Sequence, residues 1–411
     1  MKAGLGKIRS TLVKQAGNVI ISLYGLMIEG KHCFENIGEK RGSLLFQETL
    51  GLSQVYAKET VRLYTEQMAT NADEIIKQLR ESSAQIIRQG PLHGLWIKDC
   101  RYIPVDIDTT AMDNSKTKKE GVSFTYRGFD GYHPIMAYVG KEGYMLDCEL
   151  RPGSQHCQNG TPAFIESVLE QLKKVKAGGR VLFRMDSGND SFDTLKAVTA
   201  KKTHYCIIKR NKRQENDETW LKTAKRYGKR IVSRKGKKIW IGTLAVHPKR
   251  KADTLEQVTM VFEVIERKID AAGNTLLFPQ IAVNSWWTNL DCPAEKVIAL
   301  YRDHATSEQF HSELKHDMDI ERLPSGKLAV NRIVLAVAMN AYNALRLLGQ
   351  KSVEPENRKQ VRRKRLGTVI RELICVAGKL VKHGRELIFK MNETDPMLSV
   401  FLRLNAALDC P

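Results

Sequence analysis

Two short, mostly apolar segments of this chain each lead to an aspartate. The order of the predicted strands and helices around them limits the folds that the chain can adopt. Residues 102–110 read Tyr-Ile-Pro-Val-Asp-Ile-Asp-Thr-Thr, and residues 180–186 read Arg-Val-Leu-Phe-Arg-Met-Asp. Alternation and helical spacing add strands at 132–139, 144–150 and 204–209 and helices at 161–175 and 192–200. This order, three strands followed by helix, strand, helix and strand, predicts an α/β fold.

The segments on either side differ in pattern and suggest five parts. We expect an N-terminal all-α DNA-binding or dimerisation domain at 1–95, the first part of the core at 96–210, a β-rich insertion at 211–290, a helical second part of the core at 291–350 and a basic region at 351–411. The insertion has hairpin turns at 234–237 and 270–274. In the first part, segments 44–50 and 57–68 flank Gly51, which suits either a helix-turn-helix or two ordinary bundle helices.

The charge balance favours a polyanionic partner. Lys and Arg number 66 against 46 Asp and Glu, a net charge of +20, which makes nucleic acid the first candidate. Six of the eight residues 358–365 are basic, among them Arg358, Arg362 and Arg363. This cluster fits DNA backbone contacts and a solubilising linker equally well. A second basic stretch, 222–238, has Trp220 and Trp240 close by.

Several classes of protein are excluded by absent motifs. The 8 cysteines lie far apart without the spacing of a zinc site, as expected for reduced thiols in the cytoplasm. P-loop, zincin and serine esterase motifs are missing. The longest apolar run, 333–339, stops at Asn340, well short of the roughly 18 residues of a membrane span. We therefore expect a cytoplasmic protein without a membrane partner.

Asp108 and Asp186 are the first candidate site residues. If their strands are parallel neighbours, both side chains leave the sheet at the edge where α/β folds build sites. A single acid at such a place is more often a turn or capping residue, but two together favour a site. Asp106 would lie on the same strand face, and Asp108 is preferred because it abuts Thr109 and Thr110.

A third acid, Glu308, lies in a helical segment after the insertion. Four polar residues of that segment step by 3, 4 and 7 and so share one helical stripe: Tyr301, His304, Glu308 and Lys315. A solvated amphipathic face would explain the stripe, but it would not explain the two strand-end acids.

At these residues the sequence resembles the DDE transposases of bacterial insertion sequences, in the branch with Tyr-x2-Arg-x3-Glu-x6-Lys and a preceding β-rich insertion. The similar blocks are Asp-Ile-Asp108-Thr-Thr, Leu150-Arg-Pro-Gly153, Arg184-Met-Asp186-Ser-Gly188 and the helix 301–315, with flanking similarity at 25–68 and 367–391. The resemblance implies a ribonuclease H-like mixed sheet flanked by helices and interrupted by the insertion.

The resemblance also implies the roles of the site residues. Asp108, Asp186 and Glu308 would be the catalytic triad and would bind two Mg²⁺ or Mn²⁺ ions, since hard cations prefer carboxylate oxygens. Tyr301 and Lys315 would contact DNA. The family's arginine is His304 here, which replaces a fixed cation with a group mostly neutral at pH 7, and Arg302 is one position away from the tyrosine.

The function implied is a cut-and-paste transposase. It would bind terminal inverted repeats and target DNA as a homodimer in the synaptic complex, and it would be nucleoid-associated in a bacterial cytoplasm. Alternatives are a catalytically lost, transposase-derived DNA-binding protein and a ribonuclease H-like nuclease. Trp286 and Trp287 suit either core packing or stacking on an unpaired base.

Overall fold

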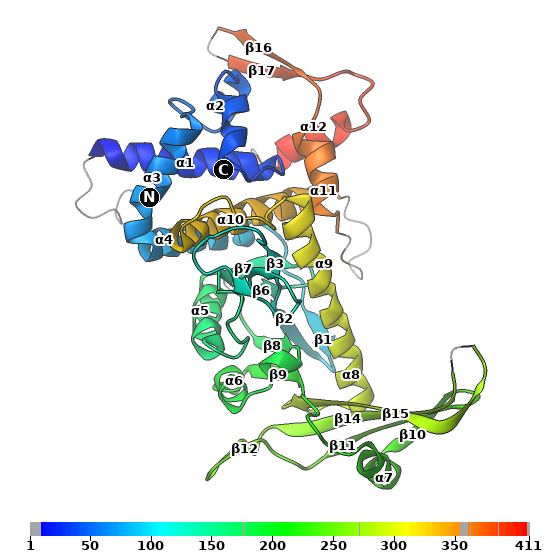
Figure 1. The fold of residues 1–411 in the computed structure, drawn as a ribbon. Helices are drawn as coiled ribbons and strands as arrows, with labels where there is room; N and C mark the ends of the chain where they lie inside the picture. Colours follow the sequence, from blue (N-terminus) through cyan, green and yellow to red (C-terminus); the bar gives the residue numbers. More distant parts are fainter. Residues whose placement is uncertain are drawn as a thin grey trace.

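The computed structural model describes residues 10–175, 177–270, 272–353, 361, 363–384 and 386–408. Helices cover the first part of the chain, and a large sheet follows (Figure 1). The N-terminal helices are α1 (Ser10–Ile28), α2 (Leu44–Thr49), α3 (Lys58–Met68) and α4 (Ala72–Arg88). Gly51, in a left-handed conformation at φ +61°, turns the chain between α2 and α3.

The central sheet is mixed, as the α/β expectation requires. Its order β7-β6-β2-β8-β9 places β2 antiparallel to β6 and parallel to β8, with β8 parallel to β9. The strands are β1 (Leu95–Ile97), β2 (Cys100–Thr109), β6 (Ile135–Val139), β7 (Tyr144–Glu149), β8 (Arg180–Met185) and β9 (His204–Lys209). β8 is apolar and buried along almost its whole length, because it is covered on both faces. The predicted mixed sheet flanked by helices is confirmed.

A small sheet between β2 and β6 was not predicted. Its order is β3-β5-β4, formed by β3 (Met112–Asp113), β4 (Ser123–Phe124) and β5 (Asp130–Tyr132). Ser154 donates its backbone N–H to the Ser123 hydroxyl at 2.8 Å, which fastens this sheet to the loop after β7. The small sheet lies directly after the carboxyl end of β2 in the chain.

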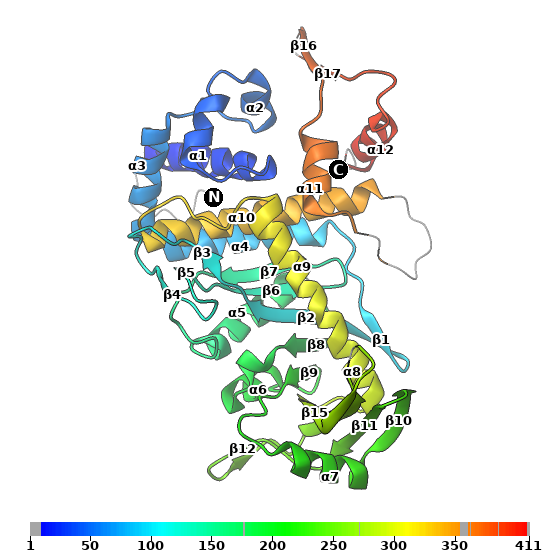
Figure 2. The same ribbon diagram turned by 45° about the vertical axis from the view of Figure 1, so that its right-hand side comes forward.

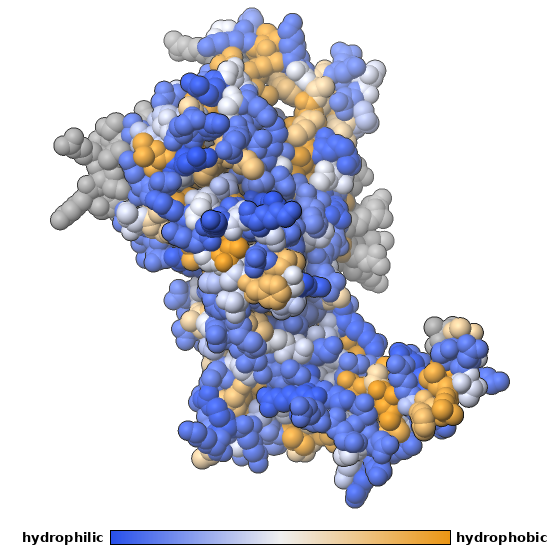
Figure 3. All heavy atoms as spheres, viewed as in Figure 1, coloured by the Kyte–Doolittle hydropathy of each residue, from blue (hydrophilic) through white to orange (hydrophobic). Residues whose placement is uncertain are grey.

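The insertion extends the central sheet rather than forming a separate one. It contains α7 (Asp217–Tyr227), β10 (Lys229–Arg234), β11 (Lys237–Leu244), β12 (Lys249–Arg250), β13 (Asp253–Thr254), β14 (Thr259–Ile269) and β15 (Thr275–Thr288). β15 joins the core by pairing with β9, where Trp287 lies opposite Ile208. Both predicted hairpin turns are present. The ends of β14 and β15 project as an arm, whose apolar surface is visible at the lower right of Figure 3.

Three hydrophobic clusters hold the sheet between its helices. α5 (Thr161–Lys174) and α6 (Phe192–Val198) pack on one face, and α8 (Ala294–Arg302) packs on the other beneath β8 and β9. The third cluster joins α1 and α4 to β6, β7 and α10 (Leu328–Ser352). Figure 2 shows α10 and α4 lying between α1 and the sheet.

α10 is the central helix of the molecule. By length and composition it could cross a membrane, but 78% of its apolar window is buried inside the protein. Its buried asparagines bond to other elements: the Asn340 amide donates to the Leu79 carbonyl at 3.0 Å, and the Asn343 amide donates to the Met145 carbonyl at 2.7 Å. These contacts are those of a helix in the protein core.

The predicted helical segment after the insertion is present and departs from α-helical geometry at two places. α8 passes through a 3-10 turn, Asp303–Ala305, into α9 (Thr306–Ser312), which ends in a π turn, Glu313–Asp317. Glu313 in that turn forms a buried ion pair of 2.6 Å with Arg346 of α10. The C-terminal part contains α11 (Leu366–Val369), the hairpin β16 (Lys379–His383) and β17 (Glu386–Lys390), and α12 (Leu398–Leu408).

Candidate active site

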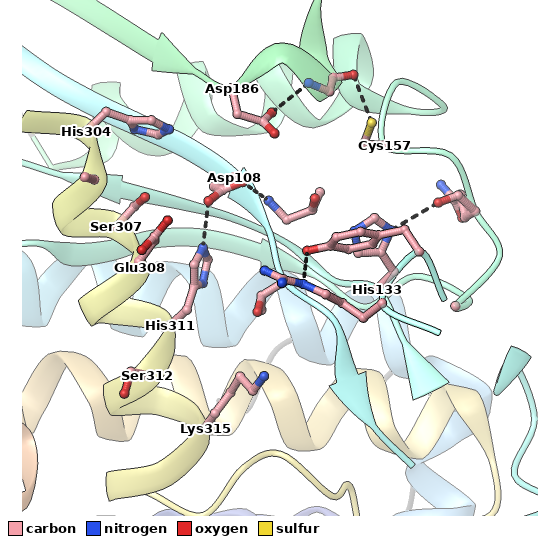
Figure 4. Close-up of a pocket in the computed structure, with 18 of the residues that line it drawn as sticks. Asp108, His133, Cys157, Asp186, His304, Ser307, Glu308, His311, Ser312 and Lys315 are labelled. Carbon is pink, nitrogen blue, oxygen red and sulfur yellow. Dashed lines mark hydrogen bonds and ion pairs between the residues drawn. The ribbon is translucent and has the colours of Figure 1, made fainter. Parts of the chain in front are cut away.

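The two strand-end acids lie side by side at the carboxyl edge of the sheet. Ile107 of β2 is opposite Met185 of β8, so Asp108 and Asp186 follow at the same level on neighbouring parallel strands. Asp108 Oδ1 accepts the Thr109 backbone N–H at 2.8 Å. Asp186 Oδ1 accepts the Gly188 N–H at 3.1 Å and the Asn189 amide at 2.9 Å, which orients it toward the same space (Figure 4).

That space is an open cavity of about 950 Å³ between the sheet edge and α9. Glu308 lines it from α9, and Figure 4 shows Glu308 and His311 projecting from that helix on the side of Asp108. The whole predicted stripe lines the cavity: Tyr301, His304, Glu308 and Lys315. Residues separated by more than 200 positions in the sequence therefore share one site.

The two aspartates have pKa values that are shifted in opposite directions. Burial raises the pKa of Asp186, and the negative charge of Asp108 raises it further. Burial acts on Asp108 in the same sense, but the hydrogen bond and charge of His311 outweigh it, so the pKa of Asp108 is lowered. Mutual repulsion of this kind is relieved when a cation binds between two carboxylates.

The donor chemistry fits a hard divalent cation, although the ligands are not gathered into a finished cluster. The three carboxylates supply the oxygen ligands that Mg²⁺ and Mn²⁺ prefer. Among the residues described, no three His, Cys, Asp or Glu side chains are close enough together to hold a metal ion. Of the three candidate metal ligands, Asp108 and Asp186 are neighbours at the sheet edge. Glu308 is solvent-exposed and lines the same cavity.

Asp106 is held in a buried ion pair and does not share the environment of Asp108. Its two oxygens accept a bidentate pair of hydrogen bonds from Arg184, both 2.7 Å, and all of these groups are buried. His304 Nδ1 lies 2.9 Å from Asp106 Oδ1. Burial opposes protonation of His304, but the hydrogen bond and charge of Asp106 outweigh it and raise the pKa of the imidazole. His304 is therefore held by Asp106 and is only 5% exposed.

The other predicted DNA contacts are placed as follows. Arg302 is exposed at the cavity rim and bonds Glu263 of β14 at 2.7 Å. Lys315 Nζ donates to the Ala111 carbonyl at 2.8 Å and pairs with Glu321 at 2.9 Å. Arg363 lies over the Phe310 ring, 4.5 Å from its centroid, and does not line the cavity. Arg358 and Arg362 lie outside the described residues.

Base stacking by the tryptophan pair is not supported by its position. Trp286 is 3% exposed and packs beside Tyr301, with 5.6 Å between ring centroids. Trp287 is 8% exposed and donates its indole N–H to Asp190 at 2.9 Å. Both are core residues of the junction between the insertion and the sheet, so of the two interpretations the structure favours core packing.

Three site residues were missed by sequence reasoning. His311 Nε2 lies 3.4 Å from Asp108 Oδ2, and its position three residues after Glu308 is the signal that could have indicated it. His133 lines the cavity and is 6% exposed. Arg127 reaches the cavity from the loop after β4, where a hydrogen bond to Tyr126 and, more weakly, the charges of Glu308 and Asp108 raise its pKa.

The chain is similar to a known protein family and to a solved structure. Residues 45–410 match the family model described as transposase DDE domain group 1. A solved structure of a piggyBac transposase synaptic complex with hairpin DNA is similar at a TM-score of 0.42 and 11% identity, over 86% of this chain and 70% of that one. No curated protein sequence matches the chain. Because the family model spans most of the sequence, this chain belongs to the DDE transposase domain group 1 family.

Proposed function

We propose that the protein is a cut-and-paste transposase that binds the terminal inverted repeats of an insertion sequence and catalyses metal-dependent cleavage and strand transfer. The observation that carries the proposal is the shared cavity of Asp108, Asp186 and Glu308 in a member of the DDE transposase family. The net charge of +20 supports double-stranded DNA, both repeats and target, as the partner. Because two transposon ends must be paired, the synaptic complex would contain two protomers. The enzyme would be cytoplasmic and associated with the nucleoid.

In the proposed reaction, Asp108, Asp186 and Glu308 would hold two Mg²⁺ or Mn²⁺ ions. Such ions neutralise charge on the phosphorus centre and lower the pKa of the attacking water. Asp108, whose pKa is lowered, would remain ionised and available as a metal ligand. His311 and Thr109 orient its carboxylate.

The other residues of the cavity act on DNA. Water attack on the phosphodiester releases a 3′ hydroxyl, and that hydroxyl then attacks the opposite strand or the target. Arg127, Arg302 and Lys315 are the cations at the cavity that would contact the flanking phosphates. Tyr301 is held by Trp286 and lines the cavity next to Asp186. Because water is the first nucleophile, the reaction requires no covalent protein intermediate.

The experiment combines the flanking DNA with a cleavage assay. Inverted repeats should bracket the reading frame, and the purified full chain should nick end-labelled repeat DNA with Mg²⁺ or Mn²⁺ but not with EDTA. Glu308→Gln should lower the cleavage rate by at least about 100-fold while DNA affinity is kept. Glu295→Gln, an exposed glutamate on α8, is the matched control and should cleave normally.

Each alternative gives a different result in this assay. Repeat binding by the wild type without cleavage would identify a catalytically lost DNA-binding protein. Cleavage without strand-transfer products would identify a nuclease. Metal-dependent cleavage that survives Glu308→Gln would contradict the proposed triad.

A further inference from the structure

Two large aromatic side chains are exposed at the rim of the cavity. Phe124 is 67% exposed and Tyr126 is 62% exposed, and both line the cavity from the small sheet β3-β5-β4. Aromatic residues of this size are usually largely buried. Their placement beside Asp108 means that a substrate entering the cavity meets two free ring faces.

The turn that carries the rings is firmly held. Thr125, between them, is 1% exposed, and both its backbone N–H and its hydroxyl donate to the Phe129 carbonyl at 2.8 Å. Gly128 adopts φ +86° and donates to the Thr125 carbonyl at 3.0 Å, which closes the turn. The rings are therefore presented by an ordered structure, which lowers the entropy cost of binding a ligand.

A cation accompanies the rings. The Arg127 guanidinium lies 5.2 Å from the centroid of the Tyr126 ring, and its Nε donates to the Tyr126 hydroxyl at 3.2 Å. In the part of the chain that the structure describes, Arg127 forms no ion pair with a carboxylate, so its charge is available to an anionic ligand. Two aromatic faces beside a cation match the chemistry of a nucleotide, with a base to stack and a phosphate to pair.

We propose that the hairpin 123–132 receives an unpaired DNA base at the cleavage point, with Phe124 and Tyr126 stacking on the base and Arg127 binding an adjacent phosphate. The inference rests on the proposed function, since it takes DNA as the substrate. A paired base within a duplex hides its faces in the helical stack, so the rings select a nucleotide that has left it. The buried Trp286 and Trp287 do not offer such faces.

The test is a binding experiment without divalent metal, so that no cleavage occurs. The probes are two hairpin oligonucleotides that differ only opposite one 2-aminopurine, which is unpaired in the first and paired with thymine in the second. The wild-type chain should bind the unpaired probe about 10-fold more tightly and quench its fluorescence. The double variant Phe124→Ala/Tyr126→Ala should lose this preference and keep its affinity for the paired probe.

Control variants separate stacking from general effects. Tyr126→Phe keeps the ring and should keep the preference, and Trp96→Ala, which removes an aromatic side chain 65% exposed away from the cavity, should also keep it. Equal wild-type affinity for the two probes, or a preference that survives in the double variant, would overturn the proposal. Cleavage of repeat DNA without this preference would refute the base site alone, whereas the preference without cleavage would refute only the proposed catalysis.

Discussion

His311 links the first catalytic candidate to the core of the protein. Its Nε2 lies 3.4 Å from Asp108 Oδ2, and its Nδ1 lies 3.2 Å from the hydroxyl of Tyr138 on β6. The imidazole is 5% exposed, and its ring packs edge-on against Tyr138. A carboxylate that is oriented by such a neighbour has fewer conformations to lose when it binds a cation.

The first prediction concerns this contact. His311→Ala should lower the cleavage rate by about 10- to 100-fold, because the Asp108 carboxylate loses its orienting partner. The readout is single-turnover cleavage across a range of Mn²⁺ concentrations, in which the variant should require more metal. His383→Ala, which removes an exposed imidazole on β16 away from the cavity, is the control. A variant with wild-type metal dependence would show that His311 does not position Asp108.

A second prediction separates Asp106 from Asp108. Asp106→Asn leaves the buried Arg184 without its charged partner and should reduce the free energy of unfolding by about 3–5 kcal/mol. Asp108→Asn should abolish cleavage while changing stability by less than about 1 kcal/mol, because Asp108 lies at the cavity. Urea unfolding and cleavage are measured on both variants. The assignment of the first acid is wrong if the two phenotypes are exchanged.

Third, Gly153 should be intolerant of a side chain. A Cβ at this position would lie 2.1 Å from the Ser123 carbonyl oxygen and 2.3 Å from the Gly131 carbonyl oxygen, both of them backbone atoms of the small sheet. Gly153→Ala should therefore reduce stability by about 1–3 kcal/mol and lower the cleavage rate by displacing that sheet. Gly178→Ala, with nothing within 4 Å, is the control. Thermal unfolding and cleavage together check the prediction, which fails if both variants behave alike.

The fourth prediction is a pH dependence of stability. Burial, followed by the charge of Lys201, lowers the pKa of His204 below its ordinary value of 6.5. As the pH falls below about 6.5, the unfolded chain takes up a proton before the folded one does, so stability decreases. His204→Gln lacks this contribution and should lose less stability than the wild type between pH 7 and pH 5. Parallel slopes for the two proteins in urea unfolding would contradict the assignment.

The strand-end acids could be predicted because local and long-range signals agree. The apolar runs before Asp108 and Asp186 are typical of buried parallel strands, and neighbouring strands of that kind bring their ends together. The stripe from Tyr301 to Lys315 was also readable from its spacing, and all four of its members line the cavity. The metal-binding role of the triad stays a prediction.

The rest of the site could not be predicted from local patterns. The strands of the small sheet are only two or three residues long, so residues 112–132 lack the alternation that would reveal them. The burial of Trp286 and Trp287 depends on β15 pairing with β9, a contact that no local pattern specifies. Arg127 becomes a site residue only when the small sheet and α9 are assembled around the cavity.

α10 has a consequence for the synthesis of the protein. Its buried face completes the hydrophobic cluster of α1 and α4, yet it lies more than two hundred residues after them in the sequence. While the ribosome is still translating the insertion, the N-terminal helices lack the surface on which they pack. A chain truncated before α10 would therefore not fold completely and would be degraded by proteases. It would not accumulate as a folded fragment that competes with the full-length protein for DNA.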